Sequence, residues 1–236
     1  MRAIIVIFPL LTLLVSALPL RAEEDTVAAK LIPFDALTET NRALVRGVTD
    51  HYTLRRQYSN RQIKARPPEF EWLMDHMDGC SVLAQKLGLL TYRATRDEQG
   101  RFQADNREGA SGFVQPALAR DGKRVYYVAG SQHGVFQARG RGVVVMDYAQ
   151  PQPGTIQYSS TVFVKVDNTG LAMLAQLFSI FIRNAVDQNF EHVMRQPICL
   201  SEKAVAEPQK LLEQIGLMPE EDRKLVEPFA VMLRHP

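Results

Sequence analysis

The segment from Leu171 to Val186 constrains the fold of this chain more than any other. Its apolar residues recur nearly all round a helix, whereas a helix on a protein surface carries a polar face. An aspartate and an asparagine at 167–168 can cap its start, because their side chains accept the free amide hydrogens of a first helical turn. Arg183 and other polar residues interrupt the segment, which is too short to favour a transmembrane span. We therefore expect a long helix over residues 168–195 that is covered on most sides, most simply by lying across a concave sheet.

Residues 90–166 have the period and the punctuation of short β-strands. Asp121-Gly122 is a strong signal for a two-residue hairpin, because glycine adopts the backbone angles that such a turn needs. Pro116 indicates that its strand lies at an edge or bulges. The longest strand is expected over 155–166, and the whole section is expected to be an antiparallel meander. A glycine-rich loop is expected between two of the strands, and it includes Gly130, Gly134, Gly140 and Gly142.

Helices are expected on either side of this meander. Leucines and valines at helical spacing predict a helix over 35–58, and a second begins at Pro67 because proline suits a first helical turn. Gly79 is expected to kink or divide the second helix, and Gly88 to end it. The fold class is therefore α+β: a curved antiparallel sheet wrapped around a long helix in the C-terminal half, with N-terminal helices. The expected sections of a single domain at 23–236 are helical over 35–89, antiparallel sheet over 90–166, long helix over 168–195 and tail helices over 206–233.

This order of elements resembles that of the helix-grip superfamily, which includes START-like and polyketide-cyclase-like proteins. The resemblance rests above all on the strand Val162–Val166 running into the helix Leu171–Val186, and it covers roughly residues 90–195. It implies a cavity between sheet and helix that binds an apolar ligand. Such folds place a strand before their early helices, and that strand is not evident here unless residues 26–34 supply it.

The first 22 residues have the pattern of a secretory signal peptide. Arg2 precedes a short apolar run, small residues follow, and the chain then becomes acidic. We expect cleavage after Ala22, with Ala17 as the second choice and an uncleaved anchor as the alternative. The protein is therefore expected to be exported, either to a periplasm or out of the cell.

The charge of the chain is balanced. There are 28 basic and 26 acidic side chains, and removing the leader takes away Arg2 and Arg21, which leaves 26 of each. This balance excludes the basic footprint of a nucleic-acid-binding protein. One locally basic segment is expected to be a solvated face, and a transient contact with anionic lipid or phosphate at a membrane surface is the alternative. That segment contains Arg55, Arg56, Arg61, Lys64 and Arg66.

Candidate ligand-binding residues come from the strands and from the long helix. Strand alternation places Tyr158 and Ser160 on the same face as Val162, which is the expected interior face. Two hydroxyls there would be costly to bury without partners, so they could meet each other, a water or the head group of a ligand. The candidate residues are Tyr126, Met146, Tyr148, Tyr158, Ser160, Leu174, Leu177, Phe178 and Phe181.

Cys80 and Cys199 are the two cysteines of the chain. In an exported protein they allow one disulfide bridge, and two small buried hydrophobic side chains are the alternative. His76 lies one helical turn before Cys80, but no further residues complete a metal site and the apolar surroundings favour structural roles. No catalytic residue, metal site or cofactor is expected.

The leading hypothesis is an exported, non-catalytic protein that binds an apolar or amphipathic small molecule, such as a lipid, between the sheet and the long helix. One alternative is an enzyme with a similar cavity and tyrosine and histidine acid–base groups. The other is a structural or partner-binding protein of the cell envelope. The identity of the ligand and the oligomeric state stay open at this point.

Overall fold

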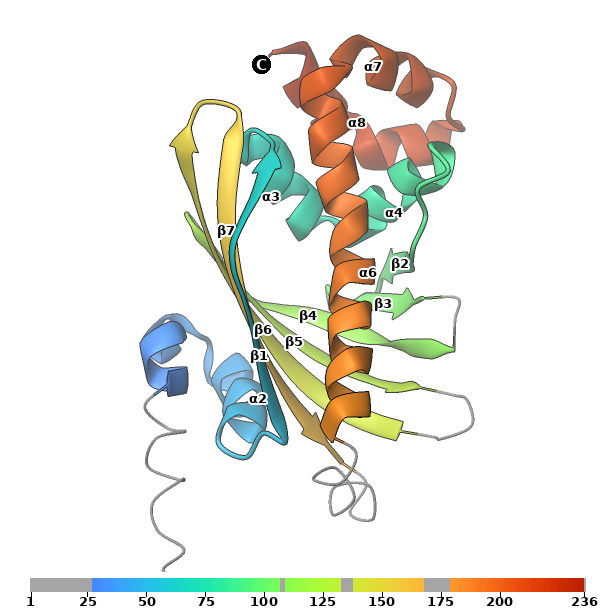
Figure 1. Cartoon of the computed structure of the whole chain (residues 1–236). Helices are drawn as coiled ribbons and strands as arrows, with labels where there is room; N and C mark the ends of the chain where they lie inside the picture. Colours follow the sequence, from blue (N-terminus) through green and yellow to red (C-terminus); the bar gives the residue numbers. More distant parts are fainter. Residues whose placement is uncertain (1–26, 107–108, 133–137, 168–178, 236) are drawn as a thin grey trace, which may run out of the picture.

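A curved antiparallel sheet of seven strands, in the order β1-β7-β6-β5-β4-β3-β2, forms the centre of the molecule (Figure 1). The computed structural model describes residues 27–106, 109–132, 138–167 and 179–235. Its strands are β1 (Leu54–Lys64), β2 (Arg93–Arg96), β3 (Phe102–Asp105), β4 (Ala110–Arg120), β5 (Lys123–Gln132), β6 (Ala138–Gln152) and β7 (Thr155–Val166). Its helices are η1 (Phe34–Ala36), α2 (Glu39–Thr49), α3 (Pro67–Asp75), α4 (Met77–Lys86), α6 (Ser179–Ala206), α7 (Pro208–Gly216) and α8 (Glu220–Arg234).

The strands from β2 to β7 confirm the predicted antiparallel sheet. Strands β4 and β5 meet at the predicted hairpin, where Gly122 has a φ of 72°, a backbone angle that glycine adopts without strain. The pairing of these strands shifts by one residue between Pro116 and Leu118. The proline therefore marks a bulge, because it has no amide hydrogen to give to the ladder.

Strand β1 corrects the prediction of a helix over 35–58. The helix ends at Thr49, and the chain then runs along β7 as an edge strand. Alternation was hard to recognise because Arg56 occupies an inward-facing position and its charge is compensated by Asp187 of α6. A bulge at Asn60, whose φ is 55°, then shifts the alternation by one residue. Strand β1 precedes α3 and α4, where the resemblance to the helix-grip superfamily led us to expect a strand. Residues 27–31 are helical and do not supply it.

The second predicted helix is two helices, α3 and α4. The break lies at His76, which has φ −129° and ψ 67°, and not at Gly79. Gly79 lies inside α4 beneath the ring of Trp72, where an added Cβ would come within 2.5 Å of a ring carbon. This glycine therefore permits close packing and does not bend the chain. Gly88 follows α4 with a φ of 67°, as expected of a residue that ends a helix.

Helices α2 and α6 lie on opposite faces of the sheet (Figure 1). On the first face, Val45 and Val48 of α2 pack with Val125, Val143 and Phe163 of the strands. On the second face, α6 runs across the sheet and continues past the predicted end at residue 195. Residues 168–178, the first part of the expected long helix, lie outside the described residues. Among the described residues, no helix combines the length and the apolar composition that a membrane crossing needs.

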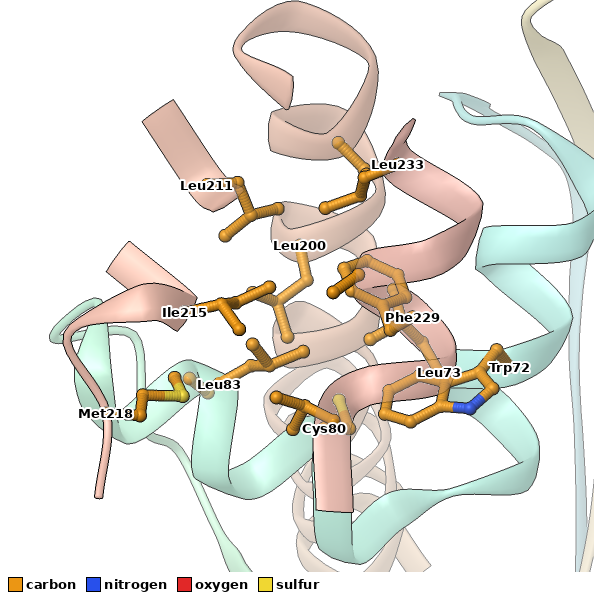
Figure 2. Close-up of a cluster of buried hydrophobic side chains, with 14 residues drawn as sticks. Trp72, Leu73, Cys80, Leu83, Leu200, Leu211, Ile215, Met218, Phe229 and Leu233 are labelled. Carbon is orange, nitrogen blue, oxygen red and sulfur yellow. The ribbon is translucent and has the colours of Figure 1, made fainter. Parts of the chain in front are cut away.

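A second hydrophobic core lies at one end of α6, which we call the helical end. It is formed by α3, α4, the C-terminal half of α6 and the two tail helices α7 and α8, which lie within the predicted section 206–233 and one residue beyond it (Figure 2). Its buried side chains include Trp72, Leu73, Cys80, Leu83, Leu200, Leu211, Ile215, Met218, Phe229 and Leu233. This core fixes α6 at one end, so the rest of the helix can extend over the sheet.

Candidate functional site

The two faces of the sheet differ in how completely they are covered. On the α2 face, Val125, Val143 and Phe163 are each 0% exposed. On the α6 face, four valines of the central strands remain partly exposed, and we call them the valine floor. They are Val114, Val128, Val144 and Val164. Because apolar surface is normally buried where the fold allows it, this partly exposed floor beneath a helix is the feature most indicative of a binding site.

Small residues extend the valine floor along the same face of the sheet. They are paired across strands β3 to β6, and they are Ala104, Gly112, Gly130 and Gly140. An added Cβ on Gly112 would lie 2.3 Å from the carbonyl oxygen of Ala129, so β4 and β5 approach here more closely than side chains allow. The predicted glycine-rich loop is therefore wrong at three of its positions, which are strand residues: Gly130, Gly140 and Gly142. Gly134 lies outside the described residues.

Helix α6 is fastened to β1 at one edge of the sheet. The carboxylate of Asp187 accepts hydrogen bonds from Arg56 Nε at 2.8 Å and from the Tyr58 hydroxyl at 2.6 Å. The Phe190 ring stacks on the Tyr58 ring, with centroids 4.0 Å apart and planes 4° from parallel. The hydrogen bond from Arg56 lowers the pKa of Asp187, and burial raises the pKa of Tyr58. A charged clasp therefore closes this edge at neutral pH.

The same helix is fastened to the opposite edge of the sheet, just before β2. The side-chain oxygen of Gln196 accepts hydrogen bonds from the backbone N–H groups of Thr91 and Tyr92, at 2.8 and 3.1 Å. The Thr91 hydroxyl donates to the backbone carbonyl of His192, at 2.9 Å. Farther along, an amide–amide hydrogen bond of 3.5 Å joins Asn106 to Asn189. Helix α6 is thus held at both edges of the sheet and runs across its face (Figure 1), and its Phe190 and Met194 share a cluster with Val114 and Val144 of the valine floor.

The strand residues proposed from the sequence lie together at one end of the valine floor. Tyr126, Met146, Tyr148 and Tyr158 belong to one buried cluster on the α6 face, which Met194 of α6 joins. A residue paired across the strands shares its partner's face, and Ser160, which pairs with Met146, therefore faces the same way. The structure brings these five candidates into one group.

The helix residues proposed for the same site are not placed by the structure. Leu174, Leu177 and Phe178 lie outside the described residues. Phe181 belongs to the first described turn of α6, and its side chain is not described. Their role in the site stays a prediction.

A buried polar network adjoins this cluster, and the sequence analysis missed it. Arg124, which is 4% exposed, donates from Nε and Nη2 to the two carboxylate oxygens of Asp75, at 2.7 and 2.8 Å. Its Nη1 donates to the Tyr148 hydroxyl at 2.6 Å, and that hydroxyl donates to Glu71 at 2.9 Å. Burial raises the pKa of Tyr148. The network joins α3 to the sheet, and the Tyr148 hydroxyl is engaged in it on both sides, so the role of Tyr148 as a ligand contact stays a prediction. No local pattern could have revealed it, because its carboxylates lie about fifty residues from Arg124 in the chain.

The cysteines and His76 do not form a reactive group. Cys80 and Cys199 are free thiols in the structure, so the bridge that the sequence allowed is not formed. Burial raises the pKa of Cys80 to about 12, which removes the thiolate needed for nucleophilic attack. The His76 ring stacks on Trp72, with centroids 4.8 Å apart. Within residues 27–106, 109–132, 138–167 and 179–235, no three potential metal ligands cluster.

The locally basic segment is largely neutralised by acidic partners. Arg56 pairs with Asp187 and Arg61 with Glu191, and both acids belong to α6. Arg66 pairs with Glu69 at the start of α3. Most of this segment therefore serves to hold the fold together.

An open groove of about 700 Å³ lies at the ends of β2 to β6. Its walls include Arg93, Gln103, Asp105, Ser111 and Arg139. By strand alternation these side chains point to the face opposite the valine floor. The groove is open, its walls also include Phe113 and Ala129, and it shares Ala104, Gly112 and Gly130 with the small residues beyond the valine floor.

A comparison with protein families and with curated proteins finds no match for this chain. Among solved structures, the chain is similar to a conserved protein from Geobacillus kaustophilus, with 13% identity over 63% of this chain and 97% of that one, at a TM-score of 0.44. It is similar to the hypothetical protein jhp0584 from Helicobacter pylori, with 6% identity over 62% of this chain and 86% of that one, at a TM-score of 0.40. It is also similar to the di-domain ARO/CYC BexL, with 16% identity over 66% of this chain and 53% of that one, at a TM-score of 0.35. At such low TM-scores and identities these likenesses carry no argument about family or function.

Proposed function

We propose that this chain is an exported protein that binds an apolar or amphipathic small molecule on the valine floor, beneath α6, without carrying out chemistry on it. The observation that carries the proposal is the contrast between the two faces of the sheet. At the centre of the α2 face Val125, Val143 and Phe163 are fully buried, whereas the central strands present partly exposed valines on the α6 face, under a helix that is fastened at both edges. An apolar ligand lying there would cover the valine side chains that the protein itself leaves partly exposed.

The energetics favour a ligand with a large apolar surface. Covering apolar area contributes about 25 cal/mol per Å², so removing on the order of 200 Å² from water contributes about 5 kcal/mol before the costs of association. Glycine and alanine beyond the valine floor add no side chains that would obstruct an extended or flat molecule. This surface selects for size and apolar character more than for a particular functional group.

Two charged groups near the valine floor, Asp187 and Arg124, support binding over catalysis. The carboxylate of Asp187 is engaged by Arg56 and Tyr58, and Arg124 is engaged by Asp75. A general acid or base must be able to exchange a proton with a substrate. These groups are committed to holding α6 and α3 in place.

The first test is to identify what the purified protein carries. We expect mass spectrometry of an organic extract to detect an apolar or amphipathic molecule in a defined ratio to protein. The second test is titration with the neutral fluorescent probe N-phenyl-1-naphthylamine, whose emission rises in apolar surroundings. Absence of both an extractable molecule and probe binding would contradict the proposal.

A matched pair of variants locates the binding site. Val144→Gln places an amide on the valine floor and should weaken probe binding about fivefold or more, because part of that amide would lose its water. Val193→Gln makes the same change on α6 at a position that is 36% exposed, and should leave probe binding unchanged. Equal binding by the two variants would place the probe elsewhere.

A further inference from the structure

Ser160 is the unusual polar residue of the candidate site. It is 1% exposed, and within the described part of the chain its Oγ has no hydrogen-bond partner. Its cross-strand neighbours are Tyr58 and Met146. The Tyr58 hydroxyl donates to Asp187, and methionine offers only a weak acceptor. A buried hydroxyl in this condition lowers stability, so its presence calls for a functional explanation.

The position of Ser160 relates it directly to the valine floor. On β7, Ser160, Val162 and Val164 point to the same face, because every second residue of a strand does so. At about 3.3 Å per residue, Ser160 lies on the order of 13 Å from Val164. Val162 is buried between them and Val164 is partly exposed. The Ser160 hydroxyl thus lies at the buried end of an apolar strip that leads along this face toward the glycines.

We infer that Ser160 Oγ hydrogen-bonds the polar group of an amphipathic ligand whose apolar body covers the valine floor. This inference rests on the proposed function and names the class of ligand. The polar group is an uncharged oxygen, such as that of an alcohol, a ketone or an ester. One serine hydroxyl cannot compensate for the loss of hydration of a buried carboxylate.

The charges nearby support an uncharged head group. The two arginines of β1 that point toward α6 are already paired, Arg56 with Asp187 and Arg61 with Glu191. An anionic head group near β1 would have to compete with Asp187 or Glu191 for these two arginines. A neutral alcohol would need only the hydrogen bond that Ser160 can give or accept.

The experiment compares two ligands that differ only in the head group. After removal of bound lipid, the full-length mature protein is loaded with N-phenyl-1-naphthylamine, and the probe is displaced with 1-dodecanol or with dodecanoate at pH 8. We expect dodecanol to bind more tightly than dodecanoate. Ser160→Ala should weaken dodecanol binding about three- to tenfold, the value of one hydrogen bond, and leave probe and dodecanoate binding unchanged. Ser111→Ala, at an exposed serine on the other face of the sheet, is the control and should match the wild type.

Stability gives a second readout. The lipid-free Ser160→Ala protein should melt at the same temperature as the wild type or higher, because the change removes an unsatisfied hydroxyl. Dodecanol binding equal to wild type in Ser160→Ala, or a preference of the wild type for dodecanoate, would overturn the inference and leave the proposed function standing. A wild-type protein that binds neither probe nor dodecanol would overturn both.

Discussion

The close approach of β4 and β5 makes a sharp prediction for Gly112→Ala. The added Cβ would lie 2.3 Å from the carbonyl oxygen of Ala129 and 2.6 Å from the Cα of Gly130. Carbon atoms in contact normally lie 3.5–4.0 Å apart, so the overlap with the Cα of Gly130 is about 1 Å. Both obstructing atoms are backbone atoms of a paired strand and cannot rotate away.

The loss of stability in Gly112→Ala can be estimated from the movement of β4 away from β5. The strands can separate only by weakening the backbone ladder between them, at about 1 kcal/mol for each hydrogen bond, and overpacking itself typically costs 1–3 kcal/mol. We therefore expect Gly112→Ala to lower the free energy of unfolding by about 3 kcal/mol. With a slope of roughly 2–3 kcal/mol per M for a domain of this size, the urea midpoint should fall by about 1 M.

Gly47→Ala is the matched control. Gly47 lies inside α2, and an added Cβ would meet nothing within 4 Å. Alanine favours a helix over glycine by about 0.8–1 kcal/mol, so this variant should be more stable than the wild type. Urea unfolding followed by far-UV circular dichroism measures both changes. An unchanged or raised midpoint for Gly112→Ala, at the same slope, would show that the strands are not held together as closely as described.

Three further outcomes are expected. Asp187→Asn should lower the free energy of unfolding by about 1 kcal/mol at pH 7, because the clasp is partly exposed. Since the folded-state pKa of Asp187 is lowered, its contribution is present above the unfolded pKa and is lost as the pH falls through the folded pKa, so the thermal melts of variant and wild type should converge in acid. A thiol reagent should label Cys199 in the native protein and Cys80 only in denaturant, and labelling of neither thiol in denaturant would indicate the bridge that the structure lacks. The mature protein purified from the exporting cell should begin at Glu23, which N-terminal sequencing measures, and a mature chain that still carries the leader would contradict cleavage.

The parts of the fold that sequence predicted are those that depend on local chemistry. The turn at Gly122 is specified by a residue that tolerates positive φ, and the bulge at Pro116 by a residue without an amide hydrogen. The starts of α3, α7 and α8 are marked in the same way by prolines. Such signals act within a few residues, so one sequence is enough to recognise them.

The parts that sequence missed depend on partners far away in the chain. Strand β1 has an arginine at an inward-facing position, and only Asp187, more than a hundred residues later, makes that position acceptable. The glycines of β5 and β6 indicated a loop, whereas they permit close contact between strands. The network around Arg124 likewise joins strands to α3. In each case a tertiary contact overrides the local preference.

The candidate site follows the same division. Alternation along β7 was enough to place Tyr158 and Ser160 on one inward face, and the structure groups them with Tyr126 and Met146. The sequence did not indicate that the side chains of the valine floor are partly exposed, because their exposure depends on which part of the sheet α6 leaves uncovered. The edge contacts at Asp187 and Gln196, which set the height of the helix above the sheet, are also long-range.

Helix α6 belongs to both hydrophobic cores, and this makes a final prediction about cooperativity. Leu200 packs in the helical end beside Phe229, while Met194, less than two turns earlier, packs against the sheet. Trp72, the single tryptophan, lies in the helical end, so its fluorescence reports that core, whereas near-UV circular dichroism of the tyrosines reports mainly the sheet. Because one continuous helix is shared, the two signals should give the same urea midpoint. Phe229→Ala should lower the free energy of unfolding that each signal reports by the 3–5 kcal/mol that such a cavity costs. If the tryptophan fluorescence changed at a lower urea concentration than the tyrosine signal, the helical end would unfold as a separate unit. That core could then not hold α6 over the valine floor.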